Sequence, residues 1–264
     1  MCGRLAPGSI YDGVVRMTEE ILEHGVPLYV VTDWADRFPW LFAGITHAGS
    51  GPDPFDLRRF GEPASRRAPA RWKSLLQALA FETIVYAHQL HETRIVIHDR
   101  VGKGVRETEG GADGHATADS GVLLAVTVAD CVPVYLLDTD ARAVALLHAG
   151  WKGVAAGILL RGITLFGQRW GSDPTHLRVH LGPAICGECY EVGPEVFGAL
   201  GLEIPPAPAP VDVRATLARQ ARAAGVPTEG ITVSDICTLC GDANLFSHRA
   251  GRSERQVAVV GIRP

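Results

Sequence analysis

The sequence predicts an α/β (α+β) fold, a single domain with mixed β-sheets and a central antiparallel hairpin. Helical and β-prone segments mix along the 264 residues without the strict alternation of a doubly wound fold. Two apolar segments, 132–137 and 143–147, flank the turn-forming sequence DTDA and predict the hairpin. The sequence also lacks the G-x-G-x-x-G and Walker loops of dinucleotide-binding and P-loop domains.

Local composition predicts the elements before the hairpin in turn. Residues 13–24 suggest a short helix, and the β-branched run at 27–33 predicts a strand. A Gly-, Pro- and Arg-rich loop at 47–69 then leads into a helix at 71–81. The remaining expected elements are strands at 83–87, 93–98 and 122–128, the last preceded by a Gly-, Thr- and Asp-rich loop at 102–120.

The elements after the hairpin begin with a helix at 153–170. Its few polar side chains recur at helical spacing, so we expect it to be mostly buried. A strand at 177–181 and a helix at 213–224 lie on either side of a proline-rich connector at 204–210, and a strand at 256–262 closes the chain. The length favours one domain over residues 1–264, with 1–38 as an N-terminal extension.

The bulk composition excludes several classes of protein. A formal charge of −4 with scattered basic residues argues against broad nucleic-acid binding. No apolar run approaches the length of a membrane span, and the N-terminus lacks the apolar core of a secretory signal. We therefore expect a cytoplasmic protein. In such a compartment, its six cysteines are thiols or metal ligands rather than a disulfide scaffold.

The hairpin brings one thiol towards one imidazole. If the turn is a two-residue loop at Thr139-Asp140, Cys131 lies directly opposite His148 on the same face of the sheet. Such a pair can bind a metal ion or form a nucleophile–base dyad. Asp130 alternates to the other face, where it is expected to order the site or to cap the strand.

His91 is the third candidate for the same site, because it also lies between a strand and a loop. One cysteine and two histidines leave the fourth tetrahedral position for water or substrate, the pattern of a catalytic zinc site. For each residue alone, a buried thiol or a hydrogen-bonded histidine is the competing interpretation.

A second group of candidate ligands consists of two C-x-x-C sequences. Two such pairs indicate a structural zinc site when the fold brings them together. Free thiols or a disulfide are the alternatives. The four residues are Cys186, Cys189, Cys237 and Cys240.

Seven short segments carry a resemblance to a known family. They are QLH at 89–91, ADCVP at 129–133, HAGWKG at 148–153, GPAI at 182–185, YEVG at 190–193, CT at 237–238 and SHR at 247–249. Taken together they resemble the laccase-domain family, also called the multicopper polyphenol oxidase or peptidoglycan-editing-factor family. The match runs in order from about Thr46 to the C-terminus.

The resemblance implies a layered α/β/β/α fold and a zinc ion held by His91, Cys131 and His148. It also implies phosphorolysis of adenosine, inosine and methylthioadenosine, with adenosine deaminase activity. We expect purine nucleosides and phosphate as partners, a monomer or homodimer, and substrate contacts from residues in these segments. Those residues are Gln89, Asp130, Tyr190 and Arg249.

Three other functions stay open. A copper-dependent polyphenol oxidase would use Cu²⁺ in place of Zn²⁺, although the ten histidines form no His-x-His pair of the kind multicopper oxidases use. A metal-free hydrolase with a Cys131–His148 dyad would act on peptidoglycan precursors. The fourth alternative is a non-enzymatic partner protein.

The chain departs from the family pattern at three places. The usual Thr-Arg is Thr46-His47, an Asn-Arg pair is replaced by Arg71-Trp72, and a Gly-Arg is Glu254-Arg255. The first two are expected in one wall of the site, so they bear on phosphate binding and on the choice of substrate.

Overall fold

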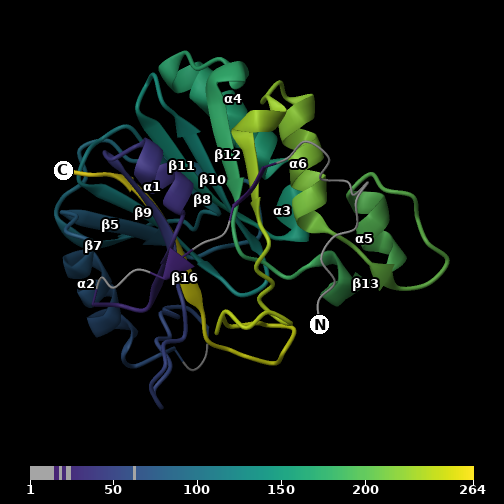
Figure 1. Cartoon of the computed structure of the whole chain (residues 1–264), viewed down its shortest axis with the longest axis horizontal. Coiled ribbons are helices and arrows are strands. Elements are labelled where there is room, and N and C mark those ends of the chain that lie inside the picture. Colours follow the sequence, from purple (N-terminus) through teal and green to yellow (C-terminus); the bar gives the residue numbers. More distant parts are fainter. Residues whose placement is uncertain (1–14, 18–19, 22–24, 62–63) are drawn as a thin grey trace.

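The computed structural model describes residues 15–17, 20–21, 25–61 and 64–264, which form four layers (Figure 1). Two seven-stranded mixed sheets pack face to face. The outer face of the first sheet is covered by α3 (Trp151–Ala155), α4 (Ile158–Trp170) and α6 (Val213–Ala223). The outer face of the second is covered by α2 (Ala68–Ala78). The predicted α/β/β/α arrangement is confirmed.

Each sheet combines strands from distant parts of the chain. The first sheet has the order β1 (Val15–Met17), β15 (Ile231–Ser234), β12 (Leu177–Leu181), β10 (Val132–Asp138), β11 (Ala143–Ala149), β8 (Gly114–Thr117) and β6 (Ile95–Ile97). The second has the order β2 (Glu20–Ile21), β3 (Leu28–Val30), β4 (Leu41–Thr46), β16 (Gln256–Ile262), β9 (Val122–Val128), β5 (Thr83–Ala87) and β7 (Gly104–Thr108).

The remaining elements are short. They are α1 (Thr32–Arg37), α5 (Pro194–Ala199), the two-stranded ribbon of β13 (Glu191–Val192) and β14 (Ala209–Pro210), and 3₁₀ turns at Pro174–His176, Gly187–Cys189 and Thr228–Gly230. Part of the expected N-terminal extension belongs to the layers themselves, because β3 pairs with β4 and Trp34 of α1 is buried between the sheets.

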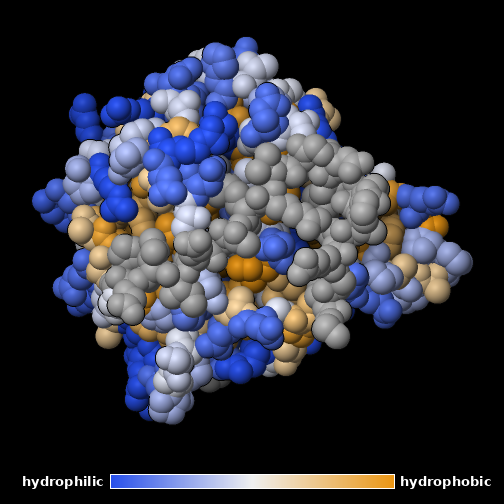
Figure 2. Space-filling view, viewed as in Figure 1, coloured by the Kyte–Doolittle hydropathy of each residue, from blue (hydrophilic) through white to orange (hydrophobic). Residues whose placement is uncertain are grey.

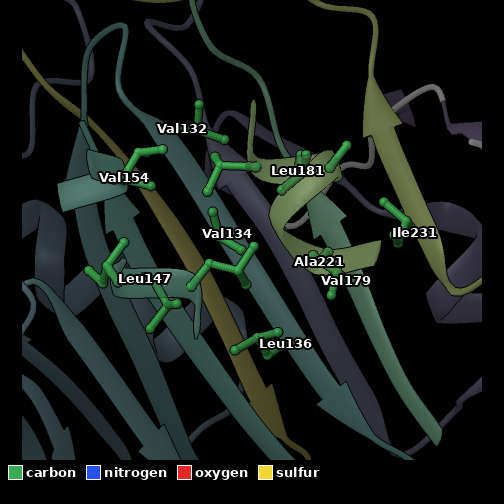
Figure 3. Close-up of a cluster of buried hydrophobic side chains, with 14 of the residues drawn as sticks. Val132, Val134, Leu136, Leu147, Val154, Val179, Leu181, Ala221 and Ile231 are labelled. Carbon is green, nitrogen blue, oxygen red and sulfur yellow. The ribbon is translucent and has the colours of Figure 1, made fainter. Parts of the chain in front are cut away.

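The central hairpin, β10 and β11, is apolar at almost every position because both of its faces are covered. Val134 and Leu136 point to the helices, where they pack with Val154 and Ala221 (Figure 3). Alternate residues such as Tyr135 lie between the two sheets. The hydroxyl of Tyr135 donates to the Gly44 carbonyl at 2.8 Å, which ties β10 to the second sheet.

The helix predicted at 13–24 is wrong where the structure describes it, since 15–17 and 20–21 are strands. The rest of that range lies outside the described residues. The loop predicted at 102–120 contains β7 and β8, which pair with β5 and β11 although their composition is polar. The expected helix at 153–170 is two helices, separated at Gly157, where φ is 80°. Elements that the sequence did not predict include β15 and α5.

The register predicted for the hairpin is wrong by two residues. Pro133, not Cys131, lies opposite His148. Because side chains alternate with a period of two, an even difference leaves every side chain on its predicted face. Cys131 and His148 thus become diagonal neighbours on one face, a relation that still lets long side chains meet.

The turn between the strands explains the difference. Asp138 pairs with Ala143, so the loop has four residues rather than two. The Asp138 carboxylate accepts the backbone N–H groups of Asp140 and Ala141 at 2.8 and 2.9 Å, which stabilises the longer turn. Arg142 completes it in the left-handed region, with φ of 47°.

On the face shown in Figure 2, hydrophilic residues cover much of the upper and lower rims, with apolar side chains visible between them. Among the described residues, no helix is long and apolar enough to cross a membrane.

A buried histidine pair predicts how stability depends on pH. His98 Nε2 and His115 Nδ1 are 2.8 Å apart, and both rings are buried. Burial lowers the pKa of His98 to about 4 and that of His115, which His98 also lowers, to about 3. Between pH 6.5 and 4 the unfolded chain therefore binds protons that the folded chain does not, and stability is lost as pH falls.

We expect the free energy of unfolding to decrease by roughly 3 kcal/mol from His98 alone between pH 7 and 4. Urea unfolding at several pH values measures this slope. His98→Gln keeps a hydrogen-bonding group without the titration and should flatten the slope. His176→Gln changes an exposed histidine and should leave it as in the wild type. Equal slopes in wild type and His98→Gln would contradict the prediction.

Candidate metal centre

Three side chains predicted from sequence to form one site do converge. His91 follows β5, Cys131 lies in the crossover from β9 to β10, and His148 is near the end of β11. One ligand atom from each lies within 4.8 Å of the others. His148 is buried, Cys131 is half-buried and His91 is exposed, so the group is open on the His91 side.

Gly150 makes this convergence possible. A Cβ atom at residue 150 would lie 3.0 Å from Cys131 Sγ and 3.1 Å from His91 Cδ2. These contacts are tighter than most Cβ contacts in proteins, so a side chain here would displace two of the three donors by a few tenths of an ångström. The glycine of the HAGW segment is thus explained by close approach.

Asp113 holds the two histidines in place, and sequence reasoning missed it. Its fully buried carboxylate accepts the backbone N–H groups of Leu90, His91 and Glu92, each at 2.9 Å. The same carboxylate lies 2.9 Å from His148 Nδ1. This contact leaves Nε2 of His148 as the ligand atom, the arrangement found around histidines that bind metals.

The electrostatics of the centre favour a thiolate. Burial opposes ionisation of Cys131, but the positive charge of His148 and hydrogen bonds from both histidines outweigh it and lower the pKa of the thiol to about 6. Burial alone would lower the pKa of His148, whereas Cys131 and Asp113 together raise it to about 9. A thiolate is the form of cysteine that binds a metal, and a bound metal ion would take the place of the proton on His148.

Asp130 directly precedes Cys131 and lines the same small cavity, and its carboxylate is engaged with the protein. It accepts the hydroxyl of Thr238 at 2.6 Å and the backbone N–H of Arg249 at 2.7 Å. Asp130 also has φ of 84°, which turns the chain sharply before the thiol. Asp130 therefore links the crossover that carries Cys131 to the loops that contain Thr238 and Arg249.

Gln89 has a similar linking role. Its side-chain amide exchanges hydrogen bonds with the backbone of Thr127 at 2.7 and 2.8 Å, which fixes the His91 turn to β9. Tyr190 and Cys131 both line a cavity of about 30 Å³. The guanidinium of Arg249 lies 5.1 Å from the centroid of the Tyr190 ring. Tyr190 and Arg249 thus form a wall beside the centre.

A second, basic cavity of about 250 Å³ is lined by Arg58, His248 and Arg255 among others. A single Asp56 oxygen accepts the backbone N–H groups of Arg58 and Arg255 at 2.9 and 3.0 Å. Burial and the charge of Arg58 lower the pKa of Arg255, while the charges of Cys131 and Asp130 oppose that effect. The Arg58 Nε is buried without a hydrogen-bond partner. Two arginines in the lining of one cavity favour the binding of an anion.

The departures from the family pattern have different surroundings. Trp72 is fully buried in the core beneath the second sheet and donates to the Leu57 carbonyl, so it does not line the site. Arg71 pairs with Asp53 and donates to the Asp56 carbonyl. The Nε2 atom of His47 is buried and has no hydrogen-bond partner.

The two C-x-x-C sequences also meet in space, which is the condition under which their spacing indicates a metal site. The four Sγ atoms of Cys186, Cys189, Cys237 and Cys240 lie within 4.8 Å of one another. They form a second cluster, which shares no residue with the first.

Comparison with known proteins agrees with this architecture. The crystal structure of YlmD from Geobacillus stearothermophilus superposes with a TM-score of 0.83 at 29% identity, over 93% of this chain and all of that one. The crystal structure of a Bacillus licheniformis hypothetical protein, YfiH, gives a TM-score of 0.80 at 25% identity, over 90% of this chain and 97% of that one.

The relatives in sequence are named as enzymes. The chain is 34% identical to purine nucleoside phosphorylase YlmD of G. stearothermophilus, over 87% of this chain and 93% of that protein. It is 32% identical to adenosine deaminase RL5 of an unknown prokaryotic organism, over 72% and 78% respectively. Residues 64–263 match the model of a family described as multi-copper polyphenol oxidoreductase laccase. With most of its length matched and its layers shared with YlmD and YfiH, the chain belongs to this laccase-like family.

Proposed function

We propose that the protein is a zinc-dependent purine nucleoside phosphorylase, acting on adenosine, inosine and methylthioadenosine, with adenosine deaminase activity. The names of its relatives support a phosphorylase and a deaminase. The observation that carries the proposal is a three-donor centre, His91, Cys131 and His148, whose thiolate charge acts on Arg255 in the lining of a basic cavity. A nucleoside and an inorganic anion need two such neighbouring sites. We further propose a cytoplasmic monomer or homodimer.

The donor set suits zinc. One thiolate and two imidazoles match the three-ligand pattern of open zinc sites, and His148 already has the carboxylate partner that such ligands use. When bound there, zinc supplies Lewis acidity at neutral pH. Copper binds the same donors, but the described residues contain only one cluster with histidines among its ligands, fewer than a multicopper oxidase needs.

The surrounding residues have separable roles in this proposal. Arg58 and Arg255 bind phosphate, whose oxygen forms a bond to C1′ of the ribose as the bond from C1′ to the purine nitrogen breaks. The purine leaves with a proton, and ribose 1-phosphate remains. Tyr190 and Arg249 contact the nucleoside, whereas Gln89 and Asp130 act by positioning the loops that carry the ligands.

Inosine incubated with phosphate should yield hypoxanthine and ribose 1-phosphate, with no hypoxanthine when phosphate is omitted. Arg58→Gln should raise KM for phosphate roughly 10–100-fold, because a charge-assisted hydrogen bond contributes about 1.5–3 kcal/mol. Arg59→Gln is the matched control, since the neighbouring guanidinium lies over the Tyr86 ring and does not line the cavity. Hypoxanthine formation that is independent of phosphate would contradict the proposal.

The metal-free hydrolase is the second candidate, because Cys131, His148 and Asp113 form a chain of nucleophile, base and orienting carboxylate. Removal of metal with a chelator distinguishes the two. Loss of phosphorolytic activity that zinc restores supports the phosphorylase. Hydrolytic activity that survives the chelator and is lost on thiol alkylation supports the hydrolase.

A further inference from the structure

The four-cysteine cluster has the spacing of a tetrahedral metal site. Ligands about 2.3 Å from a zinc ion in a tetrahedron are about 3.8 Å from one another. The Sγ atoms of Cys186 and Cys240 are 3.8 Å apart, and all four lie within 4.8 Å. Sulfurs joined in a disulfide would be about 2.05 Å apart. The spacing fits one four-coordinate ion better than two disulfides.

Backbone amides are arranged around one of these sulfurs. Cys237 Sγ accepts the N–H groups of Cys186 at 3.3 Å, Leu239 at 3.4 Å and Cys240 at 3.5 Å. Hydrogen bonds to sulfur favour the thiolate, which is the form of cysteine that binds metals. The first of these bonds also crosses from one C-x-x-C turn to the other, so the two turns are held together on the backbone as well.

The four-cysteine cluster is directly connected to the wall formed by Tyr190 and Arg249 beside the candidate metal centre. Cys189 is followed directly by Tyr190, whose ring lies under Arg249. Cys237 is followed directly by Thr238, which donates to Asp130 next to Cys131. An ion held by the four sulfurs would therefore fix both the wall and the Cys131 crossover with respect to each other.

A second set of backbone contacts connects the same segments. Ala184 and Cys237 form a parallel bridge, and the N–H of Thr238 donates to the Ala184 carbonyl at 3.1 Å. The N–H of Ile185 donates to the Asp130 carbonyl at 3.1 Å. The segment before Cys186 is thus hydrogen-bonded to the Cys131 crossover. A displacement of the C-x-x-C turns would therefore also displace that crossover.

We propose that Cys186, Cys189, Cys237 and Cys240 bind one structural zinc ion, and that this ion positions the Tyr190 wall over the substrate. Four thiolates form a closed site with no position left for water or substrate, in contrast to the centre at Cys131. The positioning role rests on the proposed function, whereas the metal site does not.

Metal content tests the site. The full-length protein, purified without added metal or chelator, should contain two zinc ions per chain by mass spectrometry. Cys131→Ala and the double variant Cys189→Ser/Cys240→Ser should each contain one. Asp242→Ser, an exposed change beside the second turn, should retain both. Wild-type zinc content in the double variant, or iron in place of the second zinc, would overturn the assignment.

Steady-state kinetics test the positioning role. Cys240→Ser should raise KM for inosine roughly tenfold with kcat little changed, because a small displacement of a substrate-positioning wall is costly. Cys240→His should restore both zinc and KM, since three thiolates and one imidazole also hold structural zinc. An unchanged KM in zinc-depleted Cys240→Ser would overturn this role. A wild-type protein without phosphorolytic activity would refute the proposed function and leave the metal result standing.

The wild-type protein alone supplies a test that does not depend on the folding of variants. When the protein is produced in medium with cobalt in place of zinc, it should show the absorption of cobalt in a tetrahedral site with four thiolates. The absorption of cobalt in a site with one thiolate should be present as well. A spectrum with the one-thiolate site only would overturn the proposal.

Discussion

Cys131→Ala should remove metal from the candidate metal centre and lower kcat/KM by more than about a hundredfold, which exceeds the usual cost of losing a residue that only positions a metal ligand. The physical reason is that Cys131 is the anionic member of the three proposed donors, and two imidazoles alone bind zinc weakly. Zinc content and phosphorolysis of inosine measure the two effects.

A variant pair on the His91 turn controls this experiment. His91→Ala removes a ligand and should reproduce the loss, whereas His88→Ala changes an exposed histidine of the same turn, whose ring packs on Phe60, and should retain the metal. Full activity in metal-free Cys131→Ala would rule out the proposed centre, and the circular dichroism spectrum would show whether each variant is folded.

Asp113→Asn should weaken zinc binding roughly 10–100-fold and lower the free energy of unfolding by about 3–5 kcal/mol. The carboxylate accepts three backbone N–H groups and meets His148, and a neutral amide has only one oxygen to offer them. The NH₂ group of the new side chain would face donors. Zinc competition with a chelating dye and urea unfolding give the two quantities.

Asp119→Asn is the matched control for this change. Asp119 is half-buried, lies further along the same segment and accepts the backbone N–H of Arg100. Its substitution should leave zinc affinity unchanged. If Asp113→Asn behaved like this control in both measurements, the role assigned to the buried carboxylate would be wrong.

The part of the fold that could be predicted from sequence is the part with a dense local signal. The apolar runs of β9, β10, β11 and β16 are recognisable because both faces of each strand are buried. The strands β7 and β8 were missed, since polar sequences such as GVRET and GHAT become strands only when neighbouring strands supply their hydrogen bonds.

The candidate site also has a part that local sequence patterns predict and a part that they do not. Cys131 and His148 were placed on one face despite a wrong register, because the error was even and the alternation of side chains is a local property. Asp113 lay in a segment interpreted as a loop, and nothing in its immediate sequence distinguishes it from the other acidic residues. A histidine that binds a metal usually donates its other ring N–H to a carboxylate or a carbonyl, so a partner for His148 could be expected. That rule does not say which carboxylate is the partner.

The sequence by itself determined the class of fold, the family and the candidate thiol and imidazole donors, because these follow from short-range patterns. Only the tertiary structure decided which groups position them. Asp56 lies 199 residues from Arg255, and Asp130 lies 108 from Thr238, yet each pair is joined by a direct hydrogen bond. Contacts between such distant residues arise when two sheets pack and bring their loops to one edge, and no local pattern encodes that event.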